Sequence, residues 1–138
     1  MDAPTADELR VHPVVIAAFE AAWADSFPDN PALRHEEGGY VYRNPTTGEV
    51  VIRRALPGTR LALSLNSPPL VAGAFLVATY HTHPNPISEG NDPDPSKDDR
   101  YWADDCGVPW FVVSELGVVS VGPTRRIGGM TGNPRYPR

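Results

Sequence analysis

The feature that most constrains the fold is an apolar run at residues 71–80, which continues directly into His81 and His83. A run that is apolar nearly throughout is typical of a central strand with both faces buried. Such strands occur mainly in α/β proteins, where helices cover each side of the sheet. The sequence therefore predicts a layered α/β fold in which this strand delivers two histidines to one end of the sheet.

His81 and His83 are two residues apart, so in an extended strand their side chains project from the same face. Two imidazoles on one face can share a metal ion, and a catalytic zinc site uses three protein ligands plus a water. Pro95 and Ser96 have the character of a helix start, which places Asp99 in the first turn, able to turn back toward the end of the strand. We therefore expect a Zn²⁺ cofactor held by His81, His83 and Asp99.

These residues resemble the signature of the JAB/MPN metalloproteases, also called JAMM proteases. The family pattern of His-[Ser/Thr]-His-Pro followed by Ser-x-x-Asp is similar to residues 81–84 (His-Thr-His-Pro) and 96–99 (Ser-Lys-Asp-Asp). The family also has an upstream Glu-x-x-Gly-hydrophobic stretch, which Glu36 matches because it stands three residues before Gly39. The resemblance covers roughly residues 30–121, although the segment between the two motifs is longer than the family usually has.

The resemblance implies a cytidine-deaminase-like JAB/MPN fold, with a mixed β-sheet, the first helix on one side and the helix after Ser96 on the other. It also implies a zinc metallopeptidase of the bacterial stand-alone or effector- and toxin-associated type, which cleaves a peptide or isopeptide bond. In that role Glu36 takes and returns the proton of the attacking water, and Ser96 donates a hydrogen bond to the carbonyl oxygen as it gains charge. The implied partner is a protein substrate, such as a ubiquitin-like or sulfur-carrier protein, contacted by residues 85–95.

Simpler interpretations exist for the same residues. Ser96 and Asp99 fit a helix-capping box, and Glu36 and Glu37 fit ordinary surface charges between which the residues alone do not choose. Two other functions also stay open: a non-catalytic, zinc-stabilised protein-binding module, and a zinc hydrolase of small amides. Cys106, the only cysteine, is interpreted as a structural thiol, with an extra metal ligand as the alternative. A single cysteine cannot supply the Pro-Cys-x-x-Cys motif of the zinc deaminases.

Composition sets the broader limits. A chain of 138 residues with 41% hydrophobic content fits one domain, residues 1–138, with an irregular tail from residue 122. A net charge of -5 gives no general reason to expect nucleic-acid binding, and the local run of arginines at the C-terminus is interpreted as a solvated tail. Neither a signal-peptide pattern nor a membrane-spanning run is present, so we expect a cytoplasmic protein with no membrane contact, unless a specialised secretion system exports it.

Periodicity and turn residues predict the remaining elements. Apolar residues spaced by three and four positions indicate an amphipathic helix at 14–25, with Pro13 near its first turn. The other predicted elements are strands at 40–42 and 49–53, a half-buried strand at 61–65, a helix at 96–104, and a hairpin at 110–114 and 118–121. In this scheme Glu36 lies at the entrance of the first hairpin.

Overall fold

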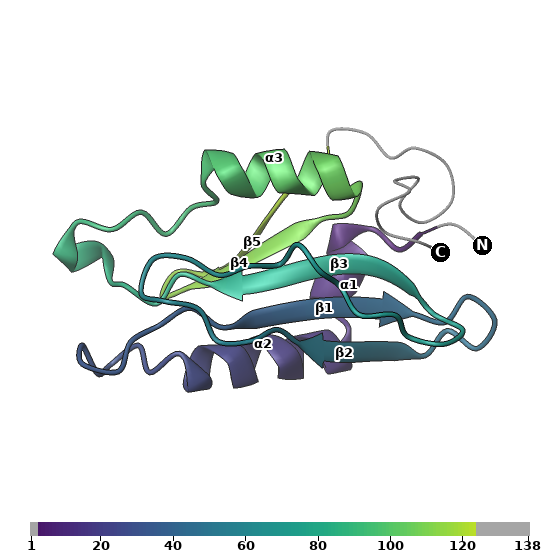
Figure 1. The fold of residues 1–138 in the computed structure, drawn as a ribbon, viewed down its shortest axis with the longest axis horizontal. Coiled ribbons are helices and arrows are strands. Elements are labelled where there is room, and N and C mark those ends of the chain that lie inside the picture. The colour runs from purple at the N-terminus through teal and green to yellow at the C-terminus, as the bar shows by residue number, and fades with distance from the viewer. Residues whose placement is uncertain (1–2, 124–138) are drawn as a thin grey trace.

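The structure of the protein, a computed structural model, describes residues 3–123. Its strands form one mixed sheet in the order β2-β1-β3-β4-β5, with helices on both faces (Figure 1). The strands are β1 (Gly38–Arg43), β2 (Val50–Arg54), β3 (Phe75–Thr82), β4 (Trp110–Ser114) and β5 (Gly117–Val121). The helices are α1 (Ala6–Arg10), α2 (Pro13–Asp25) and α3 (Lys97–Cys106), with a 3₁₀ helix, η1, at Ile87–Glu89. The predicted α/β class with a mixed sheet is confirmed.

The central strand of the sheet is β3, which pairs antiparallel with β1 and parallel with β4. Val77, Ala78 and Tyr80 are fully buried, so both faces of this strand are covered, as the apolar run predicts. The strand is displaced relative to the predicted range of 71–80. It begins only at residue 75, because Gly73 adopts a left-handed φ of 73° in the preceding turn, and it continues to residue 82.

Helices α2 and α3 cover opposite faces of the sheet, as expected (Figure 1). On one face, Phe19 of α2 packs its ring against Tyr80 and Phe111, with ring centroids 5.6 and 5.2 Å apart. On the other face, Ala103 and Cys106 of α3 are fully buried in a second apolar cluster. The burial of Cys106 among apolar side chains agrees with its interpretation as a structural thiol.

The connection between β3 and β4 determines where α3 begins. Parallel neighbours need a crossover, and α3 supplies it, since it follows β3 and precedes β4 in the chain. The first turn of α3 therefore lies at the end of the sheet where β3 finishes. Helix α3 starts after its N-cap Ser96 and ends at Gly107, which adopts a left-handed φ of 73°. The predicted helix at 96–104 is thus confirmed, with each end displaced by one or two residues.

The predicted strand at residues 61–65 is wrong. This segment has no strand partner and instead crosses over the face of the sheet that α3 also covers. Leu65 is buried at 3% exposure, Leu63 packs close to Gly38 of β1, and Leu61 is 76% exposed. The alternation of apolar side chains therefore reflects one-sided packing of an extended loop, for which no neighbouring strand is required.

One other difference from the predicted elements lies near the N-terminus. Helix α1 is an addition, and its start carries a capping box in which Thr5 and Glu8 each accept a hydrogen bond from the other's backbone N–H. The arginine-rich part of the predicted tail (Arg125, Arg126, Arg135 and Arg138) lies outside the described residues. Within residues 3–123, no helix has both the length and the apolar character needed to cross a membrane.

Candidate metal centre

The structure brings His81, His83 and Asp99 together where β3 ends and α3 begins. The two Nε2 atoms are 3.2 Å apart, and the Asp99 carboxylate lies 3.2 Å from Nε2 of His81 and 3.7 Å from Nε2 of His83. Ligand atoms on a tetrahedron with bonds of about 2.0–2.1 Å would be roughly 3.3–3.4 Å apart. The spacing of the two Nε2 atoms, and that of Oδ1 of Asp99 from His81, are close to this value, whereas the contact with His83 is longer and involves the other oxygen, Oδ2.

Glu36 lies next to these three side chains. The ligand atoms of Glu36, His81 and His83 all fall within 4.8 Å of one another, and this group could hold a metal ion. Glu36 and Asp99 are thus both candidates for the carboxylate ligand. Oδ1 of Asp99 is the oxygen near His81, and Oδ2 is the oxygen near His83. Glu36 is only 6% exposed, so it is buried beside the centre.

The local fold explains why the histidines point to one place. His81 and His83 project from the same face at the end of β3, as their two-residue spacing predicts. The ring of His81 also packs edge-on against Trp110 of the neighbouring strand, with centroids 6.2 Å apart. Burial fixes these side chains further, because His81 is only 4% exposed. The ligand geometry is therefore set largely before any ion binds.

Asp99 reaches the centre through the capping box of α3. Its backbone N–H donates to Oγ of Ser96 (3.1 Å), and its carboxylate Oδ2 accepts from the backbone N–H of Ser96 (2.7 Å). The same carboxylate faces both histidines, so the capping and metal-ligand interpretations are compatible. Ser96 uses its oxygen as an acceptor in the cap, which leaves its hydroxyl hydrogen able to donate toward the cavity that it lines.

The environment of the centre shifts three pKa values in different directions. Burial raises the pKa of Glu36 from 4.5 to about 7, with the charge of His81 acting against this rise and that of Asp99 adding to it. Burial and the neighbouring His81 lower the pKa of His83, which favours the neutral imidazole that a metal requires. Burial opposes ionisation of Asp99, but hydrogen bonding and the charge of His81 outweigh it and lower its pKa to about 2. Asp99 is therefore ionised at neutral pH, whereas Glu36 exchanges its proton there.

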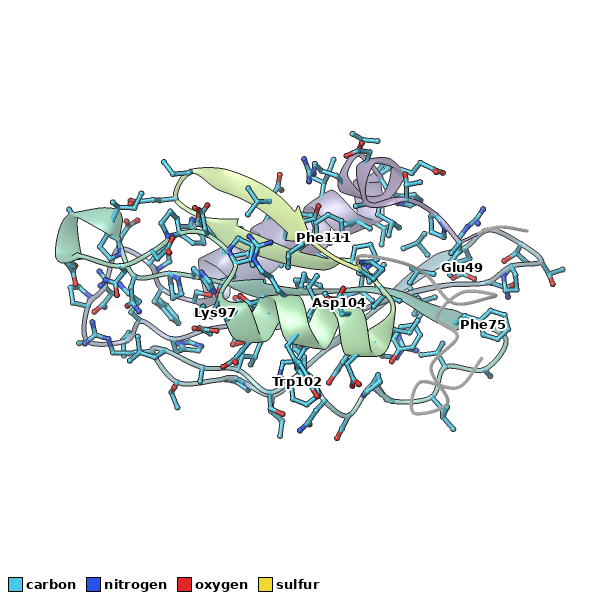
Figure 2. The ribbon with its side chains drawn as sticks, turned by 90° about the horizontal axis from the view of Figure 1, so that it is seen from above. Glu49, Phe75, Lys97, Trp102, Asp104 and Phe111 are labelled. Carbon is cyan, nitrogen blue, oxygen red and sulfur yellow. The ribbon has the colours of Figure 1, made fainter. Side chains whose placement is uncertain are left out.

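A cavity of about 380 Å³ opens beside the centre. One wall is formed by residues 61–66, the segment predicted as a strand, and another by α3, from which Trp102 projects (Figure 2). Asn85, Asn91 and Asp92 of the long loop before α3 also contribute to the lining. The acidic lining residues are Glu36, Asp92, Asp98 and Asp99, and among the described residues no lysine or arginine joins them. The cavity therefore favours neutral or positively charged groups over carboxylates.

The other candidate residues lie elsewhere. Glu37 points away from the cavity and pairs with Arg54, whose guanidinium nitrogen is 2.7 Å from its carboxylate. Cys106 is buried in the core and does not line the cavity. Loop 85–95 lines the cavity in part and is tied down by Glu89 of η1, which accepts hydrogen bonds from the buried Arg34. Because this ion pair joins distant parts of the chain, no local sequence pattern signals it.

Comparison of the chain with protein-family models, with curated proteins and with solved structures found no match. The similarity to the JAB/MPN proteases consequently depends on the motif residues at 36–39, 81–84 and 96–99. What the centre can do follows from its own side chains: two imidazoles, two carboxylates and a hydroxyl at the rim of an acidic cavity.

Proposed function

We propose that this chain is a zinc-dependent metallopeptidase of the JAB/MPN (JAMM) type, which hydrolyses a peptide or isopeptide bond in a protein substrate. The observation that carries the proposal is that the Asp99 carboxylate faces both His81 and His83, with one oxygen near each, while the buried Glu36 lies beside them. We assign Asp99 as the third ligand and leave Glu36 free for proton transfer. Metal-assisted amide hydrolysis requires this arrangement, in which three side chains bind the metal and one free carboxylate transfers the proton.

Zinc fits the donor set. Two imidazole nitrogens and one carboxylate oxygen are common zinc ligands, and a site with three protein ligands has a position open for chemistry. When bound, zinc supplies a Lewis acid that lowers the pKa of a coordinated water to about 7. Asp99 is ionised at neutral pH and His83 is kept neutral, so both offer the protonation state that zinc binding needs.

Glu36 is the proposed proton carrier. Its pKa of about 7 allows it to accept a proton from the attacking water and to return that proton to the leaving amine near neutral pH. Ser96 is the proposed stabiliser of the developing negative charge, since its hydroxyl lines the cavity and retains a free hydrogen. Both residues are positioned by backbone hydrogen bonds, Glu36 through Thr59 and Gly58, and Ser96 through the capping box.

The charge of the cavity favours one substrate class over another. A carboxypeptidase needs a cation to hold the terminal carboxylate of its substrate. The described lining offers acidic residues and no lysine or arginine, so an internal peptide bond or an isopeptide bond suits it better. A ubiquitin-like or sulfur-carrier protein, joined through its C-terminus to an amine, is the proposed kind of substrate.

The two alternative functions, a zinc-stabilised binding module and a zinc hydrolase of small amides, can be distinguished from the proposed peptidase. A zinc-stabilised binding module has no use for Glu36, and a buried carboxylate whose ionisation is disfavoured is costly to retain without a role. This feature favours an enzyme over such a module. A hydrolase of small amides would use the same residues, and it would differ by cleaving short blocked peptides as fast as proteins.

The test combines metal content with cleavage. Purified protein is loaded with zinc, its zinc content is measured by elemental mass spectrometry, and it is incubated with a peptide library from a digested cell lysate and with ubiquitin-like fusion proteins. We expect about one zinc per chain and new termini detected by mass spectrometry. Glu36→Gln should retain zinc and lose cleavage. Loss of zinc in Glu36→Gln would show instead that Glu36 is a ligand.

Two substitutions of Asp99 separate its roles. Asp99→Asn keeps an oxygen that can accept the hydrogen bond from the Ser96 N–H, so the cap persists while the anionic ligand is lost. Asp99→Ala removes both. We expect zinc binding to be greatly weakened in both variants, and helix stability to fall mainly in Asp99→Ala. If the wild type holds no zinc even after reconstitution, the proposed enzymatic function is refuted. If it holds zinc but cleaves nothing, the result favours the zinc-stabilised binding module.

A further inference from the structure

Thr82, the last residue of β3, stands between His81 and His83 but faces the opposite side of the sheet. It is fully buried, and its hydroxyl oxygen accepts a hydrogen bond from the backbone N–H of Glu37 (3.0 Å). The same hydroxyl lies 2.6 Å from Oγ of Ser26, the residue that caps the C-terminus of α2. Thr82 therefore joins the strand that carries the histidines to the segment that carries Glu36.

The direction of each hydrogen bond in this network can be deduced. Ser26 uses its single hydroxyl hydrogen to donate to the backbone oxygen of Ala22, 2.8 Å away. The hydroxyl of Thr82 must then donate to Ser26, and it accepts from Glu37. The result is a chain of hydrogen bonds from the Glu37 N–H through Thr82 and Ser26 to α2, in which each hydroxyl donates once and accepts once.

Backbone contacts extend this network to Glu36. The N–H of Thr82 donates to the carbonyl oxygen of Glu37 (2.8 Å), so both backbone groups of Glu37 bind Thr82. Glu36 is held from its other side, because its N–H donates to Thr59 (2.8 Å) and its carbonyl oxygen accepts from Gly58 (2.9 Å). Glu36 thus lies in a short segment fixed on two sides, with Thr82 forming one of them.

The side chain of Glu37 secures the same segment from the face opposite the cavity. Its carboxylate is 2.7 Å from a guanidinium nitrogen of Arg54 and 3.0 Å from Nε2 of His35. Arg54 also pairs with Asp25 at the end of α2, at 3.0 Å. Adjacent side chains of an extended segment point to opposite faces, so anchoring Glu37 on this face holds Glu36 on the other.

We propose that Thr82 is a positioning residue for Glu36, which its hydroxyl holds in place for proton transfer beside the three metal ligands. This inference rests on the proposed function of Glu36. The ligands themselves do not depend on the Thr82 hydroxyl, since His81 and His83 are placed by the backbone of β3 and Asp99 by its cap. Loss of the hydroxyl should therefore uncouple Glu36 from the centre without releasing the metal.

The test compares three variants of buried threonines on β3. Thr82→Val removes the hydroxyl at nearly constant shape, and Thr82→Ser restores it. Thr79→Val is the matched control, because Thr79 is also fully buried on β3 and its hydroxyl has no hydrogen-bond partner among the described residues. If Thr82→Val does not fold, Thr82→Ala replaces it, since that smaller side chain also removes the hydroxyl that accepts from the Glu37 N–H.

Two readouts separate positioning from a merely structural role. The first is kcat and KM on the library peptide that the wild type cleaves fastest: we expect kcat to fall about 10²-fold in Thr82→Val with little change in KM or zinc content, and to recover in Thr82→Ser. The second is the paramagnetic shift of the Glu36 carboxyl ¹³C signal in cobalt-loaded protein, which falls steeply with distance from the metal. It should be smaller in Thr82→Val and unchanged in Thr79→Val.

The outcomes distinguish the two proposals. Equal kcat and equal paramagnetic shifts in Thr82→Val and Thr79→Val would overturn the positioning role, whatever happens to stability. A wild type that binds metal but cleaves nothing would overturn the proposed function, and the paramagnetic shift alone would then decide whether Thr82 holds Glu36 in place. A wild type that binds neither zinc nor cobalt would overturn both.

Discussion

Glu36 is the residue at which stability and proposed function oppose each other, and this leads to a quantitative prediction. Burial raises its pKa from 4.5 to about 7 in the folded, metal-free protein. At about 1.4 kcal/mol per pKa unit, ionised Glu36 lowers the free energy of unfolding by about 3 kcal/mol relative to its protonated form. The side chain is 6% exposed, so solvent screens little of this effect.

The direction in which stability changes with pH follows from which state binds the Glu36 proton. Between pH 4.5 and 7 the folded protein holds the Glu36 proton while the unfolded chain releases it, so stability falls as the pH rises through this window. The loss levels off about one pH unit above the folded-state pKa of about 7. Glu36→Gln cannot ionise, so the metal-free variant should be more stable than the wild type by about 3 kcal/mol at pH 8, with the difference vanishing near pH 4.5.

The assay is denaturation by urea at several pH values between 4.5 and 8, in the presence of a chelator and followed by tryptophan fluorescence. Glu37→Gln is the matched control. It weakens the pairing of the adjacent buried carboxylate with Arg54 and should destabilise the protein by about 1–3 kcal/mol. Parallel pH profiles for the wild type and Glu36→Gln would refute the reasoning, because they would mean that Glu36 ionises as easily in the folded protein as in the unfolded chain.

Two further predictions concern the neighbours of the centre. Gly38→Ala would place a Cβ 2.2 Å from the carbonyl oxygen of Tyr80 and 2.9 Å from Cα of His81, so it should force β1 away from β3. We expect the free energy of unfolding to fall by about 1–3 kcal/mol and zinc binding to weaken. Denaturation and elemental analysis of the same sample measure the two effects. Asp98→Lys reverses a charge in the cavity lining and should leave zinc content unchanged. We expect the ratio of kcat/KM for library peptides with a lysine beside the cleaved bond to that for matched glutamate peptides to fall by roughly 2- to 10-fold, since an exposed ion pair contributes up to about 1 kcal/mol. An unchanged ratio would contradict this substrate preference.

The parts of the fold that the sequence predicts correctly are those with a strong local signal. The apolar run ending at Tyr80 indicates a strand covered on both faces, and the periodic helix that begins at Pro13 packs on one of them. The segment at 61–65 shows where such signals fail. Its alternation marks which side chains are buried, but not whether another strand pairs with its backbone, and that depends on distant residues.

Some residues of the candidate site are also predictable from local sequence, and others are not. His81 and His83 follow from strand alternation, and Asp99 from its place in the first turn of a helix, both of which are local properties. The choice between Glu36 and Glu37 needs the pairing of β1 with β3, in which Gly38 lies opposite His81 and fixes which of the two preceding carboxylates faces the cavity. That register is a long-range property, so the residues alone leave both glutamates open.

The pair of glutamates also shows how one short segment serves both folding and the proposed chemistry. Glu37 is buried with the cationic Arg54 as its partner, which compensates its charge, and its backbone anchors the segment to β3. Glu36, one residue earlier, is also buried, and this burial raises its pKa. The backbone that carries both residues is fixed by hydrogen bonds to Thr82 on one side and to Thr59 on the other. The favourable contacts of Glu37 therefore offset the cost of burying Glu36. A buried carboxylate with a raised pKa, held by a neighbour that is paired and hydrogen-bonded, is what the proposed proton carrier requires.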